Sequence, residues 1–186
     1  MDLLSLLGLT DDRRRRVERS REALYRVAYL WCHDAALADD LTQEALAKAL
    51  ARIHQLRHPE ALRSWLYGIL ANCWRDHLRA LRPTEDIDAI DEQWLATELG
   101  PEEAASQGEL AAHVRAAVQR LPLGQREVVA LVDLEECSYA EVAAILDIPM
   151  GTVMSRLCRA RAALRQSLAG TRAPQAGEAT PLRRVK

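Results

Sequence analysis

Residues 138–161 read SYAEVAAILDIPMGTVMSRLCRAR, and this stretch decides the fold. It begins with Ser138, and Glu141 follows three residues later. A serine and a glutamate at this spacing form a capping box, which predicts a short helix that ends at Leu146. The Asp-Ile-Pro sequence of residues 147–149 then predicts a turn. A capped helix followed by a tight turn is the first half of a two-helix motif.

A second helix should follow the turn, and we expect it to run from Gly151 to about Leu168. Two short helices joined by a turn of three or four residues, each with an apolar side, are typical of a helix-turn-helix. The apolar residues recur at the required positions, namely Val142, Ala143, Leu146, Ile148, Val153 and Leu157. The second helix of such a motif enters the major groove of DNA, so the stretch predicts a DNA-binding domain.

The charge of the second helix supports this interpretation. No Asp or Glu lies between Ile148 and Gly177, whereas five arginines do: Arg156, Arg159, Arg161, Arg165 and Arg172. Near the start of the helix, five side chains can reach base edges, namely Thr152, Met154, Ser155, Cys158 and Arg159. Arg156 and Arg161 are expected either to contact phosphates of the DNA backbone or to pack within the domain. The alternative is an ordinary solvated basic helix, which the turn pattern before it disfavours.

The rest of the chain also predicts helices, because its apolar residues recur at helical spacing. These helices are expected over about residues 14–30, 35–53, 60–81, 110–120 and 123–134. The sequence therefore predicts an all-α fold with two small helical bundles, over residues 14–82 and 109–168, joined by an acidic linker over residues 83–108. The tail, residues 169–186, is rich in Ala, Pro and Gly and is expected to be disordered.

Charge is segregated along the chain, although the formal net charge is only −2. Residues 13–82 carry 14 Lys and Arg against 8 Asp and Glu, and residues 113–186 carry 11 against 7. Between them, residues 83–112 carry nine acidic residues and no basic one. Solubility alone does not require two basic regions separated by an acidic one, so the pattern is a clue to function.

The third predicted helix carries a second polar face. Gly68, Asn72, Arg75 and Arg79 follow one another at spacings of four, three and four residues, so they share one side of the helix. Such a face can follow a phosphate backbone while Asn72 hydrogen-bonds a base. The turn over residues 55–59 can hold a nucleotide that has left the duplex.

Aromatic residues on the same helix are candidates for stacking on bases. Trp65 falls on the apolar stripe, so packing in the core is the preferred interpretation for it. Tyr67 is a second candidate, and the side of the helix on which Trp74 lies stays open.

Other classes of protein fit the sequence less well. No Gly-rich phosphate loop, nucleophile elbow or metal-ligand cluster is visible, so neither an enzyme nor a cofactor is expected. Cys32 and His33 are adjacent, but neighbouring helix positions point about 100° apart, so small buried thiols are preferred to a metal site. No apolar run approaches the roughly 20 residues that span a bilayer, and the start of the chain lacks a signal-peptide pattern. We therefore expect a cytoplasmic protein without membrane insertion.

Two stretches resemble one known family. Residues 40–45, DLTQEA, and residues 64–69, SWLYGI, together with Asn72, resemble region 2 of the extracytoplasmic-function (ECF) sigma factors of bacterial RNA polymerase. The stretch from Leu121 to Arg161 resembles region 4 of the same family. The resemblance covers both predicted bundles, in family order and spacing.

The resemblance implies an alternative sigma factor, which binds core RNA polymerase and directs it to promoter DNA. It also implies control by an anti-sigma factor. By resemblance, Ser155 and Arg159 read the −35 element, and the acidic linker lies in the active-site and RNA-exit channel of polymerase. The surface that binds polymerase corresponds to Asp40, Leu41, Gln43 and Glu44. The part that reads and melts the −10 element corresponds to Arg57, His58, Asn72, Arg75 and Arg79.

The chain departs from the family pattern at three positions. Family members often carry Lys or Arg where this chain has Met154, and a larger side chain where it has Cys158, so the −35 sequence cannot be transferred from relatives. Gly68 stands where a basic residue is common. The alternative function is a stand-alone helix-turn-helix regulator, which would bind specific duplex DNA by itself. A sigma factor should instead bind promoter DNA weakly until polymerase joins it.

Overall fold

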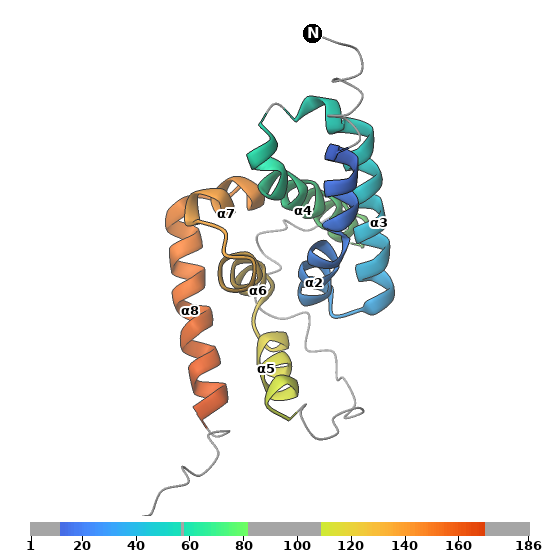
Figure 1. The fold of residues 1–186 in the computed structure, drawn as a ribbon. Helices are drawn as coiled ribbons and strands as arrows, with labels where there is room; N and C mark the ends of the chain where they lie inside the picture. Colours follow the sequence, from blue (N-terminus) through green and yellow to red (C-terminus); the bar gives the residue numbers. More distant parts are fainter. Residues whose placement is uncertain (1–11, 57, 82–108, 170–186) are drawn as a thin grey trace, which may run out of the picture.

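The computed structural model describes residues 12–56, 58–81 and 109–169. Within these ranges the chain forms only helices and the turns between them, arranged as two bundles side by side (Figure 1). This arrangement confirms the predicted all-α fold. The acidic linker and the C-terminal tail lie outside the described residues, as does Arg57. None of the described helices is long and apolar enough to cross a lipid bilayer.

The N-terminal bundle is built from four helical segments. A helix over residues 12–19 precedes α2 (Arg21–Cys32), α3 (Ala35–Arg52) and α4 (Leu62–Leu81). Two 3-10 turns, η1 (Ile53–Gln55) and η2 (Pro59–Ala61), connect α3 to α4. The inner faces of the helices carry the predicted apolar stripes, and these side chains form the core between them. The core includes Leu24, Val27, Ala45, Ala49, Leu66, Ile69 and Leu70.

The first predicted helix is interrupted in the structure. One continuous helix was expected over about residues 14–30, but it breaks at Ser20 and restarts at Arg21. The hydroxyl of Ser20 donates a 2.9 Å hydrogen bond to the carbonyl oxygen of Arg16. A serine that bonds back to the preceding turn competes with the backbone and often bends a helix, which accounts for the break.

Two caps make the connection between α2 and α3 short. His33 ends α2 in the left-handed conformation, with φ of 56°, and its backbone N–H donates to the carbonyl oxygen of Tyr29. The carboxylate of Asp34 then accepts a 2.9 Å hydrogen bond from the backbone N–H of Leu37 at the start of α3. Because only two residues separate the helices, α2 and α3 pack closely along their length.

The C-terminal bundle contains the predicted helix-turn-helix. Its elements are α5 (Glu109–Gln119), α6 (Leu123–Val129), the π-helical turn η4 (Ala130–Leu134), α7 (Tyr139–Leu146) and α8 (Met150–Ala169). The capping box of α7 is confirmed: the N–H of Glu141 donates to the Ser138 hydroxyl at 3.3 Å, and the Glu141 carboxylate accepts from the Ser138 N–H at 2.8 Å. Asp147, with φ of 57°, ends α7, and α8 begins one residue before the predicted start.

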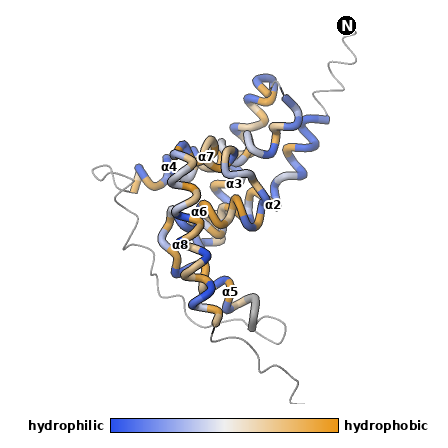
Figure 2. Tube along the Cα trace, turned by 90° about the vertical axis from the view of Figure 1, so that its left-hand side faces the viewer, coloured by the Kyte–Doolittle hydropathy of each residue, from blue (hydrophilic) through white to orange (hydrophobic). Residues whose placement is uncertain are grey.

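The two bundles pack against each other, which the sequence did not predict. Helix α7 contacts α4, and α6 contacts α2. Most buried apolar residues of both bundles belong to one continuous core, which omits Ala117 and Val118 of α5. Figure 2 shows the hydrophobic α6 near the centre of the molecule, between α2 and α8. The bundles therefore form one body in this conformation rather than two separate units on a tether.

Candidate nucleic-acid interface

The outward face of α8 carries most of the predicted readers of duplex DNA. Met154 is 46% exposed, and Ser155, Cys158 and Arg159 are exposed beside it. Val153, Leu157 and Ala160 lie buried on the opposite side of the helix. Thr152 is half-buried at the start of the helix. In the main packing α8 contacts only elements of its own bundle, and Figure 1 shows it at the outer edge of the molecule.

Two further arginines of α8 contact other elements of the same bundle. Arg156 is half-buried, and its guanidinium lies over Gly124 of α6 so closely that a Cβ there would come within 2.7 Å of it. The guanidinium of Arg161 donates two hydrogen bonds to the carboxylate of Asp133, one of them at 3.2 Å. These hydrogen bonds raise the pKa of Arg161. Arg156 therefore packs within the bundle, whereas Arg161 stays exposed in a surface ion pair, and its expected role on phosphates or in packing stays open.

A second polar face lies on α4, where the sequence predicted it. Asn72 and Arg79 are exposed, and Arg75 is half-buried. One guanidinium nitrogen of Arg75 donates a 2.6 Å hydrogen bond to the side-chain oxygen of Asn72, while Arg79 pairs with Asp76 at 3.4 Å. The interactions along the helix hold Asn72 and both arginines in one row.

The α4 face borders a groove of about 420 Å³. The wall on the N-terminal side consists of Arg52, Gln55, Ser64, Trp65, Gly68, Ile69 and Asn72, and the wall on the α7 side of Glu141, Ala144 and Ile145. Trp65 packs against the core, as preferred from the sequence, and is also one of the residues that line the groove. The groove therefore joins the predicted −10 face to the second bundle.

The structure corrects Tyr67 as a candidate for base stacking, settles the position of Trp74, which the sequence left open, and locates the turn before α4. Tyr67 is 2% exposed and Trp74 is 3% exposed, so neither presents a ring to solvent. His58 is exposed in the turn, and its ring nitrogen Nδ1 lies 3.1 Å from the carboxylate of Glu60. Arg57, the other candidate in this turn, lies outside the described residues.

The predicted polymerase-binding residues lie on α3. Asp40, Gln43 and Glu44 are exposed, and Glu44 pairs with Lys48 at 2.7 Å. Leu41 is a correction to the predicted surface, because it is only 2% exposed and packs in the core of the bundle.

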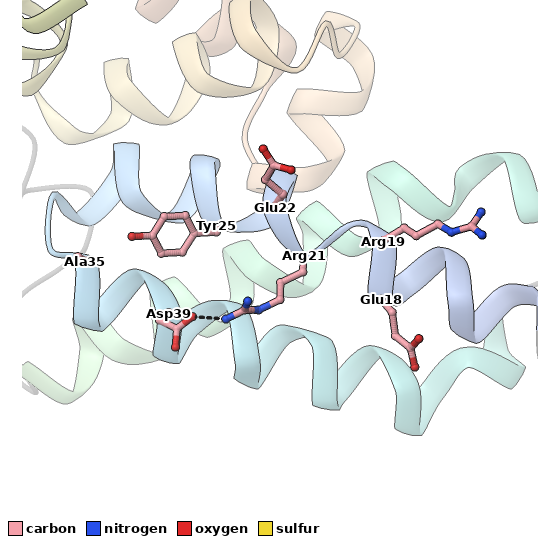
Figure 3. A pocket seen from close by; sticks show the side chains of 7 residues that line it. All are labelled: Glu18, Arg19, Arg21, Glu22, Tyr25, Ala35 and Asp39. Atoms are coloured by element: carbon pink, nitrogen blue, oxygen red, sulfur yellow. Dashed lines mark hydrogen bonds and ion pairs between the residues drawn. The ribbon is translucent and has the colours of Figure 1, made fainter. Parts of the chain in front are cut away.

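Asp39, next to Asp40 on α3, connects the predicted polymerase-binding residues to α2. Arg21 donates a 2.7 Å hydrogen bond to one carboxylate oxygen of Asp39, and the Gln43 amide donates to the other at 2.5 Å. Figure 3 shows Arg21 reaching across to Asp39 from α2. These contacts hold Gln43 in place on the exposed side of α3.

The cysteines give no indication of a metal centre. The Cys32 thiol donates to the carbonyl oxygen of Asp34 at 3.2 Å, and burial raises its pKa. In the part of the chain that the structure describes, no three His, Cys, Asp or Glu side chains come together to hold a metal ion.

Two family models match the two bundles. The model of Sigma-70 region 2 matches residues 16–84, and that of Sigma-70, region 4 matches residues 112–164. The chain is 35% identical to the RNA polymerase sigma-H factor of Pseudomonas aeruginosa over 145 residues, which is 73% of this chain and 75% of that protein. The chain belongs to the ECF family of RNA polymerase sigma factors. Members of this family are transcription initiation factors.

Other comparisons place this ECF sigma factor among the same relatives. It is 30% identical to the ECF RNA polymerase sigma factor SigW of Bacillus subtilis over 161 residues, 82% of this chain and 86% of that protein. Its structure is similar to that of the sigma factor RpoE in complex with the anti-sigma factor NepR from Bartonella quintana, with a TM-score of 0.66 and 27% sequence identity. That match covers 85% of this chain and 97% of the other.

Sequence reasoning missed the residues with which the two regions of this sigma factor contact each other. Four acidic side chains of the region 4 bundle bond to region 2: Glu127, Glu135, Glu141 and Asp147. Their partners lie on α2 and α4. The hydrogen-bonded partners are separated by between 53 and 109 residues along the chain. The only signal in the sequence was the presence of acids within an otherwise basic region, which does not identify their partners.

Proposed function

We propose that this sigma factor is a non-enzymatic subunit that acts in the cytoplasm, where it binds core RNA polymerase and selects promoters through three surfaces. Exposed residues of α3 bind the polymerase, the Asn72 face of α4 acts on the −10 element, and the outward face of α8 reads the −35 element. The observation that carries the proposal is the presence of two separate polar faces, one in each region, within a single chain.

The −35 assignment is supported by the exposure of α8. Ser155 and Arg159 are exposed side by side at the N-terminal half of the second helix of a helix-turn-helix. This is the part of the motif that contacts base edges in the major groove. An arginine there can bond a guanine with two hydrogen bonds, which gives Arg159 the leading role in discrimination.

The −10 assignment is supported by the geometry around Asn72. Its side-chain oxygen already accepts from Arg75 at 2.6 Å, so the orientation of its amide group is fixed. An oriented amide beside a groove can bond the edge of a base that has left the duplex. Arg75 and Arg79, on the same side of α4, supply positive charge for the phosphate backbone, and His58, in the turn before α4, supplies a further hydrogen-bonding group.

The polymerase assignment is supported by the acidic exposed side of α3, with Asp40, Gln43 and Glu44 as the contacting residues. Control by an anti-sigma factor is part of the same proposal, because the similar RpoE structure was solved in complex with the anti-sigma factor NepR. The acidic linker, whose charge resembles that of a nucleic acid, is proposed to occupy the RNA path of the polymerase.

Run-off transcription tests the proposal. Core polymerase plus this protein should produce specific transcripts from promoters enriched from the protein's own genome, and core polymerase alone should not. The protein without polymerase should bind the same promoters weakly. Tight polymerase-free binding to a specific duplex, without any transcript, would favour a stand-alone helix-turn-helix regulator instead.

A further inference from the structure

The first helical segment is hydrogen-bonded to the turn before α4. In the helix over residues 12–19, which is dark blue in Figure 1, Arg13 donates a 3.2 Å hydrogen bond to the carbonyl oxygen of Leu56. Arg16 donates a 3.1 Å hydrogen bond to the carbonyl oxygen of Pro59. Both bonds join residues that are 43 positions apart in the chain. Two side chains three positions apart on one helix therefore contact two carbonyl groups three positions apart in the turn.

The position of the two arginines on their helix is fixed. Residues three positions apart lie on the same side of an α-helix, about 4.5 Å apart along its axis. Val17, which follows Arg16, is fully buried and belongs to the core of the N-terminal bundle. The hydroxyl of Ser20 bonds the carbonyl oxygen of Arg16 at the end of the segment. The helix is therefore anchored to the core, and it presents both guanidinium groups to the turn.

The backbone of the turn needs these donors. Between η1 and η2 it is extended, with φ and ψ of −72° and 100° at Leu56 and of −114° and 103° at His58. Leu56 is only 5% exposed, and a buried carbonyl group needs a hydrogen-bond donor, which Arg13 supplies. The carbonyl oxygen of Pro59 accepts from the N–H of Leu62 and, with its second lone pair, from Arg16.

The two hydrogen bonds lie on either side of His58 in the chain. Its side chain is exposed and belongs to the surface proposed for the −10 element. Arg13 and Arg16 themselves are half-buried, and their guanidinium groups bond the main chain of the protein. They are therefore placed to act on nucleic acid through the turn, by fixing the main chain from which His58 projects.

We propose that Arg13 and Arg16 are positioning residues for promoter opening, whose hydrogen bonds to Leu56 and Pro59 keep the turn before α4 in the conformation that receives the unpaired −10 strand. A turn that is already ordered loses little conformational entropy when the strand binds, so it binds more tightly. The inference rests on the proposed role of this turn at the −10 element. The contact between helix and turn does not depend on that role and is measured by itself.

The test uses three double variants of the full chain. Arg13→Ala with Arg16→Ala, the turn variant, removes both donors. Arg14→Ala with Arg19→Ala, the surface variant, removes the same two positive charges from exposed positions of the same helix. Arg13→Lys with Arg16→Lys, the lysine variant, keeps the charge and a donor at each position. Circular dichroism and thermal denaturation check that all three are folded.

The first readout is hydrogen exchange of single amides in the turn, measured by NMR. The N–H of Leu56 bonds the carbonyl oxygen of Ile53 at 3.2 Å, and the N–H of Ala61 bonds that of His58 at 3.0 Å. In the turn variant these two amides should exchange about tenfold faster than in the parent, because the turn opens locally more often. Amides of α8 should keep their parent rates. The surface variant should match the parent throughout, and the lysine variant should lie between the two.

The second readout is promoter opening by core polymerase reconstituted with each variant, on a promoter that the parent uses in run-off transcription. With the turn variant, permanganate reactivity at the −10 thymines should fall about tenfold, and discrimination among −10 substitutions should weaken. Recruitment to the duplex promoter should stay near normal, since α8 is unchanged. The surface variant should open the promoter with parent-like −10 preference, and the lysine variant should recover part of the loss. A general loss of stability would instead reduce recruitment and opening together and leave −10 preference unchanged.

The outcomes separate the two proposals. Parent-like exchange of the turn amides in the turn variant would overturn the contact as the source of order. Faster exchange with parent-like opening and −10 preference would overturn the positioning role, and so would an equal loss of opening in the surface variant. The −10 assignment is judged separately with Asn72→Ala in the otherwise unchanged chain: if −10 preference stays as in the parent, the proposed function of the α4 face fails, while faster exchange in the turn variant still establishes the contact.

Discussion

The side-chain oxygen of Asn72 accepts a 2.6 Å hydrogen bond from Arg75, three residues later on α4. The same arginine faces Asp147 of the other bundle at 4.0 Å. Arg75 therefore connects the proposed base-reading amide to the contact between the bundles, and any change that separates the bundles also changes the surroundings of Asn72.

Replacing Asn72 by alanine should impair promoter opening more than promoter binding. The amide is placed to bond an unstacked base, and it has no role in recognising intact duplex. We expect near-normal recruitment of the polymerase complex to duplex promoters, with reduced permanganate reactivity at the −10 thymines. A pre-melted −10 template should not restore normal −10 base preference. Equal loss of duplex recruitment and of opening would contradict this role.

Replacing Arg159 by alanine should have the opposite effect. Loss of an arginine that bonds a base with two hydrogen bonds should remove about 1–3 kcal/mol of discrimination at the −35 element. The closed complex should weaken and accept altered −35 sequences, while transcription from a pre-melted bubble stays largely intact. Competition binding with −35 variants measures the effect, and Asn72→Ala serves as the reciprocal control. If Arg159→Ala is defective on both duplex and pre-melted templates, the −35 and −10 elements are not read by separate residues.

Reversing the charge at Asp40 and Glu44 together should weaken binding to core polymerase. Loss of one partner from an interfacial charge pair costs roughly 2–5 kcal/mol. Because both residues are exposed, helical content and thermal stability should stay close to those of the parent. Glu18→Lys, an exposed reversal on the preceding helical segment, is the control for net charge. Binding to immobilised core enzyme is the measurement, and parent-like affinity in the double variant would disprove this surface.

Leu41→Ala should behave differently from its neighbours on α3. The side chain is in the core, so its truncation should lower the free energy of unfolding by about 2–5 kcal/mol. Urea denaturation measures this loss. Once folded at low temperature, the variant should bind core polymerase with nearly parent affinity. A stable variant that fails to bind polymerase would instead place Leu41 in the interface.

Acid should destabilise the protein through His33. Burial, and secondarily the charge of Arg126, lower the pKa of His33 from its ordinary value of 6.5 to about 4. Between these pH values the unfolded chain binds more protons than the folded one. The contribution of His33 to the free energy of unfolding is therefore fully present above pH 6.5 and is lost as the pH falls towards 4. Urea denaturation gives the free energy of unfolding at pH 7 and at pH 5. The difference between these two values should be smaller for His33→Gln than for the parent. His113→Gln, at an exposed position, should retain the parent difference.

Local signals in the sequence were sufficient for most of the secondary structure. The capping box of Ser138 and Glu141 and the turn before Pro149 involve residues close together in the chain, and the structure confirms the helix-turn-helix that they predict. The break at Ser20 was missed because one side-chain hydrogen bond, rather than the apolar periodicity, produces it. The outward positions of Met154, Ser155, Cys158 and Arg159 followed from helical periodicity in the same way as the core.

Contacts between distant residues could not be predicted in this way. The bond between Tyr67 and Glu135 joins residues 68 positions apart, and Arg26 and Glu135 are 109 apart. No periodicity links such residues, so the packing of one bundle on the other appears only in three dimensions. The same limit applies to Trp74, whose buried indole N–H donates a hydrogen bond to Glu127 of the second bundle.

The outward face of α8 carries Met154 and Cys158, whose sulfur atoms form only weak hydrogen bonds. Apolar side chains in the major groove contact the methyl group of thymine rather than the hydrogen-bonding edge of a base. We therefore expect promoters of this protein to be strongly constrained at the base pair that Arg159 contacts and only loosely constrained at its neighbours. Under such a rule a functional −35 element arises by few point mutations, so new genes can enter or leave the regulon easily during evolution.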